Sequence, residues 1–443
     1  MRPRLAALAL AVVSTLSLAG CTSEAEPAGD TITMWLMGSE TSTSMSDFLI
    51  AQYENLTGNH LVVQRFPRAD MDTRIRDAMR GEIAPPDVVE VANTASSTYV
   101  YDGVFDDITD LYSVLGGDKL LSSFVEVGEN QGKQYTLPYY YRSRFIYYRK
   151  DLWEKIGVDE PPRTLPAFSE AVLKLAEENP LKINGFSGMY LAGQDWRDAL
   201  GWIHAYGGQL AEEKPSGKWE STLSSPMTVA GLTQLQDLHV NASRAPWTLK
   251  QDKPWLYLND EDKITDSLGE TVDIEISAAT IMAGPEARVH FGDRVRNDLG
   301  KHVRVWNTET FGIFPLPGTN GGPAPMYVTG SSIGVFSKSR NLEEARTILT
   351  ILFSREYQTM LAQNGLGPGN SDYEKYLGSD EFSKAMVAVA SKSKLTPAAP
   401  NWLQVENSGL VDEFFLRIFK GEDILTLAEE YDKVLTPMLN GET

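Results

Sequence analysis

Apolar and polar positions alternate along the first part of the chain with two periods, one typical of strands and one of helices. Short β-rich apolar runs predict strands, and apolar residues at helical spacing predict the helices between them, each closed by a glycine suited to a C-cap. This alternation favours an α/β fold with a mostly parallel sheet, in which ligands lie beyond the carboxyl ends of the strands. The predicted strands are 31–36, 61–66 and 87–91, and the predicted helices are 47–57 and 71–79.

The second part of the chain mixes further strands with a long helical C-terminal region. An aromatic segment, residues 139–142, separates two predicted strands, and the charged residues 251–270 are predicted to form a surface insertion. The further predicted strands are 135–138, 145–149, 274–282, 311–316 and 328–336. The further predicted helices are 165–178, 196–206, 227–240, 285 to about 298, 342–353, 355–364, 382–391, 410–419 and 424–439.

The first twenty residues have the pattern of a signal peptide. Arg2 and Arg4 precede an apolar run from Leu5 to Leu18, which is too short to span a membrane. The following tetrapeptide ends at Cys21, the single cysteine, and resembles a bacterial lipobox, in which this thiol is lipidated. Residues 1–20 are therefore predicted to be removed and 21–30 to form a lipidated tether. We expect the protein on the extracellular face of the cytoplasmic membrane.

The length and net charge of the chain limit the number of domains and the kinds of partner that we expect. A chain of 443 residues is long enough for two or three domains. Its net charge of −20 repels phosphate backbones, so we expect no nucleic-acid partner. The chain is expected to act as a monomer.

Sequence motifs for catalysis or metal binding are weak. Residues 330–334 match the G-x-S-x-G pattern of a hydrolase around Ser332, but an extended apolar pattern continues after it where the motif requires a helix. The five histidines show no metal-ligand spacing, and the acidic run 259–262 lacks the glycine and the terminal glutamate of an EF-hand. We therefore expect no cofactor and no metal site. A pair of catalytic carboxylates, as in glycosidases, stays open because their separation is a tertiary property.

Aromatic residues beside polar ones are more informative. A sugar site needs a flat apolar ring for stacking and planar polar side chains for adjacent hydroxyls. Three places in the chain combine both, although each alone is also compatible with core packing. The three sets are Tyr139-Tyr140-Tyr141-Arg142, Asp195-Trp196-Arg197 and Asn401-Trp402.

Short segments spread over residues 31–440 resemble the extracellular solute-binding lipoproteins of ABC sugar importers, in the maltodextrin-binding and chitobiose-binding group. Their order and spacing carry the resemblance. The segments are ITMWLM (32–37), PPDVVEVANT (85–94), YTLPY (135–139), YYRKDLW (147–153), AYGG (205–208), MAGP (282–285), TGSSIGV (329–335), NLEEAR (341–346) and FKGED (419–423).

This resemblance implies two α/β lobes, joined by three crossing segments, that close on a ligand by a hinge motion. One lobe would comprise residues 31–143 and 329–366, and the other 144–328 and 367–443. The resemblance further implies ligand contacts from both lobes. Those contacts are Ser39, Glu40, Asn93, Thr94, Tyr140, Arg142, Trp196, Arg197, Glu286, Gly330 and Trp402.

One position departs from the family. Glu286 stands after the Gly-Pro of MAGP, where the family commonly has Trp. The leading hypothesis is a non-enzymatic receptor that passes a di- or oligosaccharide to an ABC permease. The alternatives are a secreted glycosidase or esterase, and the same receptor fold with a cationic ligand.

Overall fold

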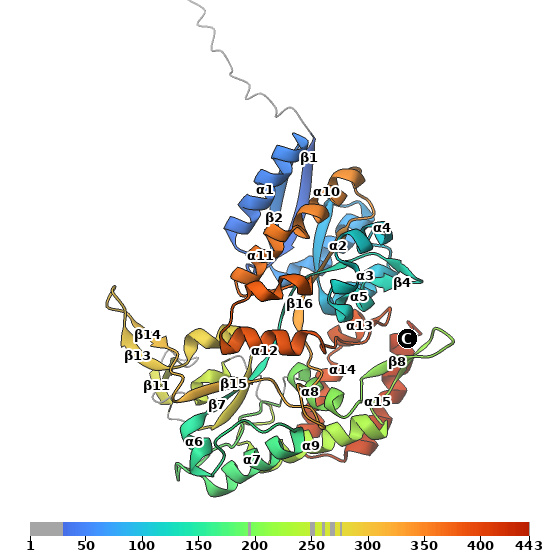
Figure 1. Ribbon diagram of the computed structural model, residues 1–443. Helices are drawn as coiled ribbons and strands as arrows, with labels where there is room; N and C mark the ends of the chain where they lie inside the picture. The colour runs from blue at the N-terminus through green and yellow to red at the C-terminus, as the bar shows by residue number, and fades with distance from the viewer. Residues whose placement is uncertain are drawn as a thin grey trace, which may run out of the picture.

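The computed structural model describes residues 30–193, 196–248, 253–258, 262–265, 271–274 and 277–442. The predicted signal peptide, residues 21–29 of the predicted tether, Asp195 and the acidic residues 259–261 lie outside these ranges. Figure 1 shows two lobes, one above the other, with strand β16 between them. The predicted two-lobed α/β architecture is confirmed.

Lobe 1 is built on a six-stranded sheet with the order β17-β6-β16-β3-β1-β2. The strands β1 and β2 are parallel, as are β1 and β3, whereas β16 runs antiparallel to β3 and to β6. The predicted aromatic segment 139–142 is part of β6 and does not separate two strands. The strand bounds are β1 Thr31–Met37, β2 His60–Phe66, β3 Val88–Ala92, β6 Leu137–Arg142, β16 Thr329–Val335 and β17 Gly367–Pro368.

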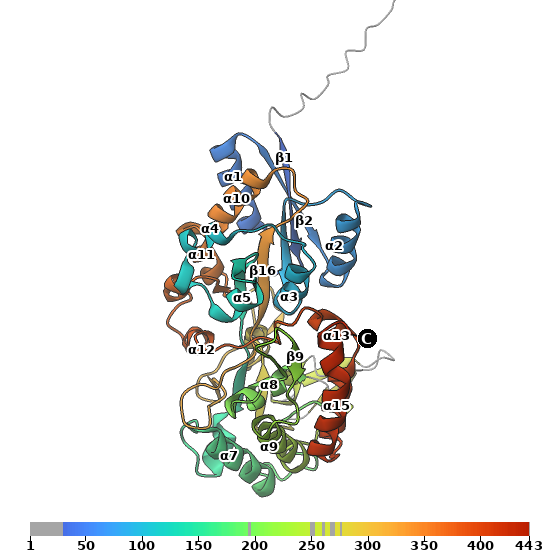
Figure 2. The same cartoon turned by 90° about the vertical axis from the view of Figure 1, so that its right-hand side faces the viewer.

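Helices cover both faces of this sheet because its central strands bury side chains on both sides. In β1, Met34 packs in one core cluster and Trp35 in another. Figure 2 shows α1 and α10 on one side of the sheet and α2 on the other. The helix bounds in lobe 1 are α1 Thr43–Thr57, α2 Met71–Arg80, α3 Asn93–Tyr101, α4 Thr109–Val114, α5 Ser122–Val127, α10 Leu342–Leu352 and α11 Arg355–Gln363.

Lobe 2 surrounds an antiparallel sheet with the order β12-β7-β15. Its core is aromatic: the Trp153 ring lies 5.1 Å from that of Tyr148 and 6.1 Å from that of Phe314. The strand bounds are β7 Phe145–Arg149, β12 Thr280–Ala283 and β15 Phe311–Phe314. The helix bounds are α6 Lys150–Lys155, α7 Leu165–Glu178, α8 Trp196–Ala205, α9 Pro226–Ala242, α12 Glu381–Ala390, α13 Trp402–Asn407, α14 Leu410–Phe419 and α15 Ile424–Leu439.

The region after the MAGP segment differs from the prediction. The expected helix to about residue 298 is a short 3-10 helix, η4 (Pro285–His290), followed by a hairpin of β13 (Asp293–Arg296) and β14 (His302–Val305). Gly292 explains the break, because it has a φ of 110° and a Cβ there would lie 1.8 Å from the carbonyl oxygen of Val305. The single strand predicted over 274–282 is likewise divided into β11 (Thr271–Ile274) and β12.

Three stretches of chain connect the lobes: residues 142–145, the entry to β16, and the stretch from α11 through β17 to α12. The strand β17 pairs with β6, so the sheet of lobe 1 extends two residues beyond the predicted boundary at 366. The Asn93 amide donates a 2.8 Å hydrogen bond to the carbonyl of Val328, which ties the start of α3 to the second crossing. Among the described residues, no helix combines the length and apolar character needed to cross a bilayer.

Candidate functional site

A cavity of about 600 Å³ lies between the lobes at the carboxyl edge of the first sheet. Ser39 and Glu40 follow β1, and Arg142 ends β6. Lobe 1 therefore contributes three lining residues from strand ends. Lobe 2 contributes Glu286 and Arg288 from η4. This position beyond the strand ends is where α/β sheets bind ligands. Four of the eleven predicted contacts therefore line one cavity.

The turn after β1 holds Glu40 at the cavity. Glu40 accepts a 3.0 Å hydrogen bond from the backbone N–H of Ser39, and its other oxygen lies 3.5 Å from the Arg68 guanidinium. Gly38, with a φ of 59°, permits this fold, because a Cβ there would lie 2.3 Å from the Glu40 carboxylate. The sequence therefore fixes a carboxylate at the edge of the sheet.

A salt bridge connects the two lobes across the cavity. Arg142 donates a 2.7 Å hydrogen bond to Glu286, and the side chains are 29% and 49% exposed. Thr329, the first residue of β16, donates a 3.3 Å hydrogen bond to the Arg142 carbonyl and fixes the arginine backbone. The pair is accessible from the cavity, and its planar groups can bond the hydroxyls of a ligand.

Two further ion pairs lie where α8 and α13 meet the crossing segments. Arg144 lies 2.9 Å from Asp198, and Arg197 pairs with Glu406. Burial raises the pKa of Tyr327 to about 12, opposed by the charge of Arg197, which places the phenol beside this guanidinium. The second Glu406 oxygen is buried and has no hydrogen-bond partner in the described part of the chain.

The two residues that begin α3, Asn93 and Thr94, were expected to contact the ligand but make hydrogen bonds within the protein. Asn93 and Thr94 are both buried. The Asn93 amide nitrogen is bonded to Val328, and its oxygen accepts a 3.0 Å hydrogen bond from the N–H of Thr94. The Asn93 side chain therefore holds the crossing segment in this conformation.

The aromatic residues expected to stack on a sugar are buried in the cores of the two lobes in this structure. Trp196 is fully buried and Trp402 is 1% exposed; their ring centroids lie 6.3 Å apart, edge to face. Tyr140 is 1% exposed within the core of lobe 1. A large aromatic at the start of an amphipathic helix suits a core position as well as a binding platform, so sequence alone could not separate the two.

Gly330 also has a structural explanation. It is buried, its φ is 156°, and a Cβ would lie 2.2 Å from the carbonyl oxygen of Tyr140. A glycine is required there because β16 and β6 approach closely at the crossing. Ser332, two residues later, is fully buried inside β16, so this segment does not have the exposed turn of a nucleophile elbow.

Sequence reasoning missed several polar residues near the crossing segments, outside the lining of this cavity. Arg144, Asp198, Tyr327 and Glu406 pair with partners far along the chain, and no local pattern announces such pairs. Glu90 could have been recognised from the sequence, because a carboxylate within an apolar, buried strand is unusual. It is fully buried beside the site, where it accepts a 2.9 Å hydrogen bond from the N–H of Met37.

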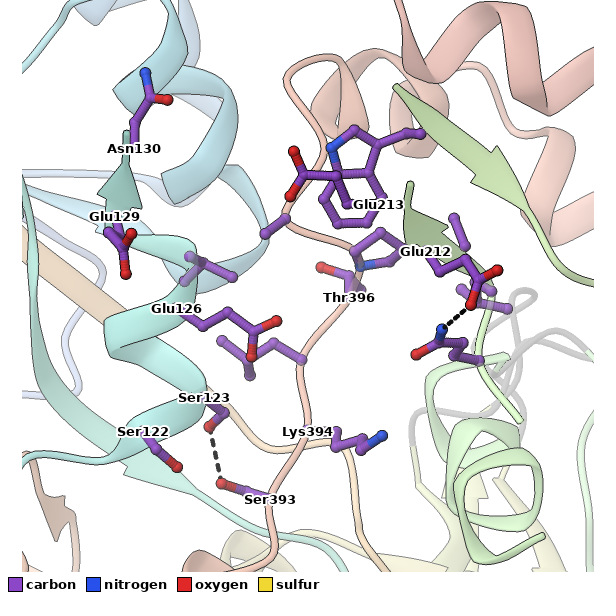
Figure 3. Close-up of a pocket in the computed structure, with 18 of the residues that line it drawn as sticks. Ser122, Ser123, Glu126, Glu129, Asn130, Glu212, Glu213, Ser393, Lys394 and Thr396 are labelled. Atoms are coloured by element: carbon purple, nitrogen blue, oxygen red, sulfur yellow. Dashed lines mark hydrogen bonds between the residues drawn. The ribbon is translucent and has the colours of Figure 1, made fainter. Parts of the chain in front are cut away.

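A second interlobe cavity, of about 840 Å³, is lined by none of the predicted contacts. Figure 3 shows it between α5 on one side and the strand that carries Glu212 and Glu213 on the other, with residues 393–396 between them. Within the described ranges, no group of three or more His, Cys, Asp or Glu side chains is arranged to hold a metal ion.

Comparisons with known proteins agree with this architecture. Residues 38–252 match the family described as Bacterial extracellular solute-binding protein. The Diacetylchitobiose binding protein DasA of Streptomyces coelicolor is 25% identical over 410 residues, which cover 91% of this chain and 89% of that protein.

Two solved structures have the same fold. The sugar-binding protein MalE from Xanthomonas citri superposes with a TM-score of 0.74 at 17% identity, covering 93% of this chain and 98% of that one. The GacH receptor of Streptomyces glaucescens superposes with a TM-score of 0.68 at 18% identity, covering 94% and 100%. With the two lobes and the cavity at the strand ends, these matches show that the chain has the fold of these binding proteins and is similar to the bacterial extracellular solute-binding proteins.

Proposed function

We propose that this protein captures a di- or oligosaccharide between its lobes and delivers it unaltered to the membrane subunits of an ABC importer. The observation that carries the proposal is the Arg142–Glu286 pair, which presents a guanidinium and a carboxylate from opposite lobes to one cavity. A ligand that bonds to both groups holds the lobes together. Binding and closure are then a single event.

The chemistry of the cavity suits a polyhydroxylated ligand. Each sugar hydroxyl donates one hydrogen bond and accepts others, and charged partners such as Arg142, Glu286 and Glu40 form the stronger kind. Micromolar affinity corresponds to about −8 kcal/mol, which a few such bonds and partial burial can supply. A hydroxyl missing from a competing sugar leaves a charged group unsatisfied at a cost of about 1–3 kcal/mol.

The names of the relatives support a carbohydrate ligand. DasA is named for diacetylchitobiose, MalE of Xanthomonas citri is a sugar-binding protein, and GacH was solved with acarbose. We therefore propose a chitobiose-, xylobiose- or cellobiose-like ligand.

The cationic alternative is less well supported at this cavity. It rested on the negative net charge of the chain and on Glu286, but Glu286 is bonded to Arg142. Arg288 lines the same cavity and is paired with Asp380. The lining carboxylates Glu40, Glu286 and Asp380 are each paired with an arginine, so a cation entering here would meet carboxylates that are already neutralised, which favours a neutral ligand.

The location proposed for the protein is the extracellular side of the cytoplasmic membrane, with a lipid on Cys21. Two or more acyl chains give stable anchoring, whereas one is marginal. Cells that produce the Cys21→Ser variant should release the protein into the medium. Retention of this variant in the membrane fraction would contradict the lipid anchor.

Titration calorimetry tests the binding function directly. We expect heat of binding with at least one of diacetylchitobiose, cellobiose, xylobiose and maltose, and chromatography after prolonged incubation should recover that sugar intact. Absence of heat with all oligosaccharides would overturn the carbohydrate proposal. Recovery of monosaccharides would favour the glycosidase alternative.

A further inference from the structure

The second interlobe cavity has walls from both lobes and does not overlap the first. In lobe 1 it is bounded by α5 and by β4 (Glu129–Asn130), and in lobe 2 by the hairpin of β8 (Ala211–Glu213) and β9 (Trp219–Ser221). In Figure 1, α5, β4 and β8 lie to the right of β16, whereas α11 and α12, which line the first cavity, extend to the left. The two cavities share no lining residue.

Carboxylates from both lobes converge on this second cavity. Glu126 and Glu129 come from lobe 1 and Glu213 from lobe 2. In the part of the chain that the structure describes, none of the three forms an ion pair, and Lys394 is the one Lys or Arg among the lining residues. Burial raises the pKa of Glu126, and the nearby charge of Glu129 raises it further, against Lys394. The cavity therefore carries an uncompensated negative charge.

Two uncharged side chains, Tyr101 and Thr396, also line this cavity. The Tyr101 ring lines the cavity and is 39% exposed, and after burial the charges of Glu213 and Glu129 are what raise its pKa. Thr396 is only 4% exposed, yet its hydroxyl has no partner among the described residues. Figure 3 places Thr396 in the middle of the cavity, between Glu126 and Glu213. A buried hydroxyl without a partner costs free energy that a bound ligand can recover.

We propose that this second cavity binds an organic polyamine, separately from the carbohydrate cavity. Ammonium groups would pair with Glu126 and Glu129 at one end and with Glu213 at the other, while Tyr101 offers a ring face to a cation and Thr396 a hydroxyl. A compact metal ion fits less well, because the lining carboxylates are not clustered as metal ligands in the described residues. A volume of about 840 Å³ accommodates an extended molecule.

The proposal connects ligand binding to the angle between the lobes. Glu126 and Glu213 belong to different lobes, so their like charges oppose the approach of the lobes on this side. A polyamine removes that repulsion only while both carboxylates are within its reach. The polyamine site is therefore complete only at interlobe angles, such as the one in this structure, that bring the carboxylates of both lobes within reach of one molecule.

Calorimetry with spermidine as the probe tests the proposal. Spermidine should bind to the wild-type protein with a stoichiometry of one, and the double variant Glu126→Gln, Glu213→Gln should bind it at least about tenfold more weakly. The matched control is Glu170→Gln, Glu177→Gln, which removes the same charge from exposed positions of α7 and should bind as the wild type does. Circular dichroism melts establish that both variants fold.

Three outcomes would overturn the inference. Spermidine could fail to bind, the control variant could lose as much affinity as the cavity variant, or Glu286→Gln, a change in the first cavity, could weaken spermidine binding as much as the cavity variant does. The last result would place the amine in the carbohydrate cavity. None of them bears on whether oligosaccharides bind, so the proposed function stands or fails by its own experiment.

Discussion

Arg142 and Glu286 lie 144 positions apart in the chain and meet at 2.7 Å between the two lobes. Arg142 ends the β6 strand of lobe 1, and Glu286 lies in the first turn of η4 in lobe 2. Because both side chains remain partly exposed, their pairing alone contributes little to stability. Their location at the cavity indicates a role in ligand binding.

Replacing Glu286 with Gln should weaken ligand binding and leave the stability of the fold nearly unchanged. The amide keeps the shape but loses the charge that strengthens hydrogen bonds to Arg142 and to a ligand hydroxyl. We expect affinity for the oligosaccharide to fall about tenfold or more, and the free energy of unfolding to change by less than about 1 kcal/mol. Calorimetry and urea denaturation measure the two quantities.

The companion variant Arg142→Lys keeps the positive charge and removes the planar fork. It should weaken sugar binding to a similar degree. Unchanged affinity in both variants would show that the pair does not contact the ligand.

Trp402 should prove to be a stabilising core residue. It is 1% exposed and packs against Trp196, so Trp402→Ala should lower the free energy of unfolding by about 3–5 kcal/mol. Trp247 is 37% exposed, and Trp247→Ala should cost only about 1 kcal/mol. Urea denaturation followed by circular dichroism compares the two.

The conservative variant Trp402→Phe distinguishes a core role from a stacking role. It keeps most of the buried area and should leave the affinity for the sugar within about twofold of wild type. A large loss of affinity with unchanged stability would instead restore Trp402 as a ring that contacts the ligand.

The fold was predictable because its signals are local. The helix predicted over 165–178 agrees with α7, whose bounds follow from an apolar stripe and from the N-cap Thr164 before it. The hairpin after η4 has no comparable local signal, because the close contact of Gly292 with Val305 that accompanies it is tertiary.

The site was predictable only in part. Ser39, Glu40 and Arg142, which the family resemblance implied as ligand contacts, line one cavity because they lie at strand ends on the carboxyl edge of the sheet. The sequence could not show whether the rings of Trp196 and Trp402 face the cavity or the core, because this depends on how α8 and α13 are rotated about their axes. The pairing of Arg197 with Glu406 depends on how α8 and α13 pack, which no sequence window contains.

Gly330→Ala should destabilise the crossing between the lobes. The added Cβ would lie 2.2 Å from the Tyr140 carbonyl, so the two strands must separate, and we expect a loss of at least about 2 kcal/mol. Gly365→Ala is the matched control: its φ is 77° but a Cβ there meets nothing within 4 Å, so about 1 kcal/mol of backbone strain is expected. Thermal denaturation of both variants isolates the steric part, and equal losses would refute the close-approach explanation.

Glu90 should make stability depend on pH near neutrality. Burial raises its pKa from 4.5 to about 7, against the hydrogen bond from the N–H of Met37 and the charge of Arg68. A raised pKa means that the folded state holds the proton more tightly than the unfolded state does. Its stabilising contribution is therefore complete below about pH 4.5 and is lost as the pH rises through 7.

The size of this effect is about 3 kcal/mol, since each pKa unit corresponds to about 1.4 kcal/mol. Glu90→Gln mimics the protonated acid and cannot ionise, so its melting temperature relative to wild type should increase between pH 5 and pH 8. Glu170→Gln, at an exposed position, should show no such trend. If the difference between wild type and Glu90→Gln were constant over this range, Glu90 would not titrate there, and the fully buried carboxylate would have to be ionised throughout or protonated throughout.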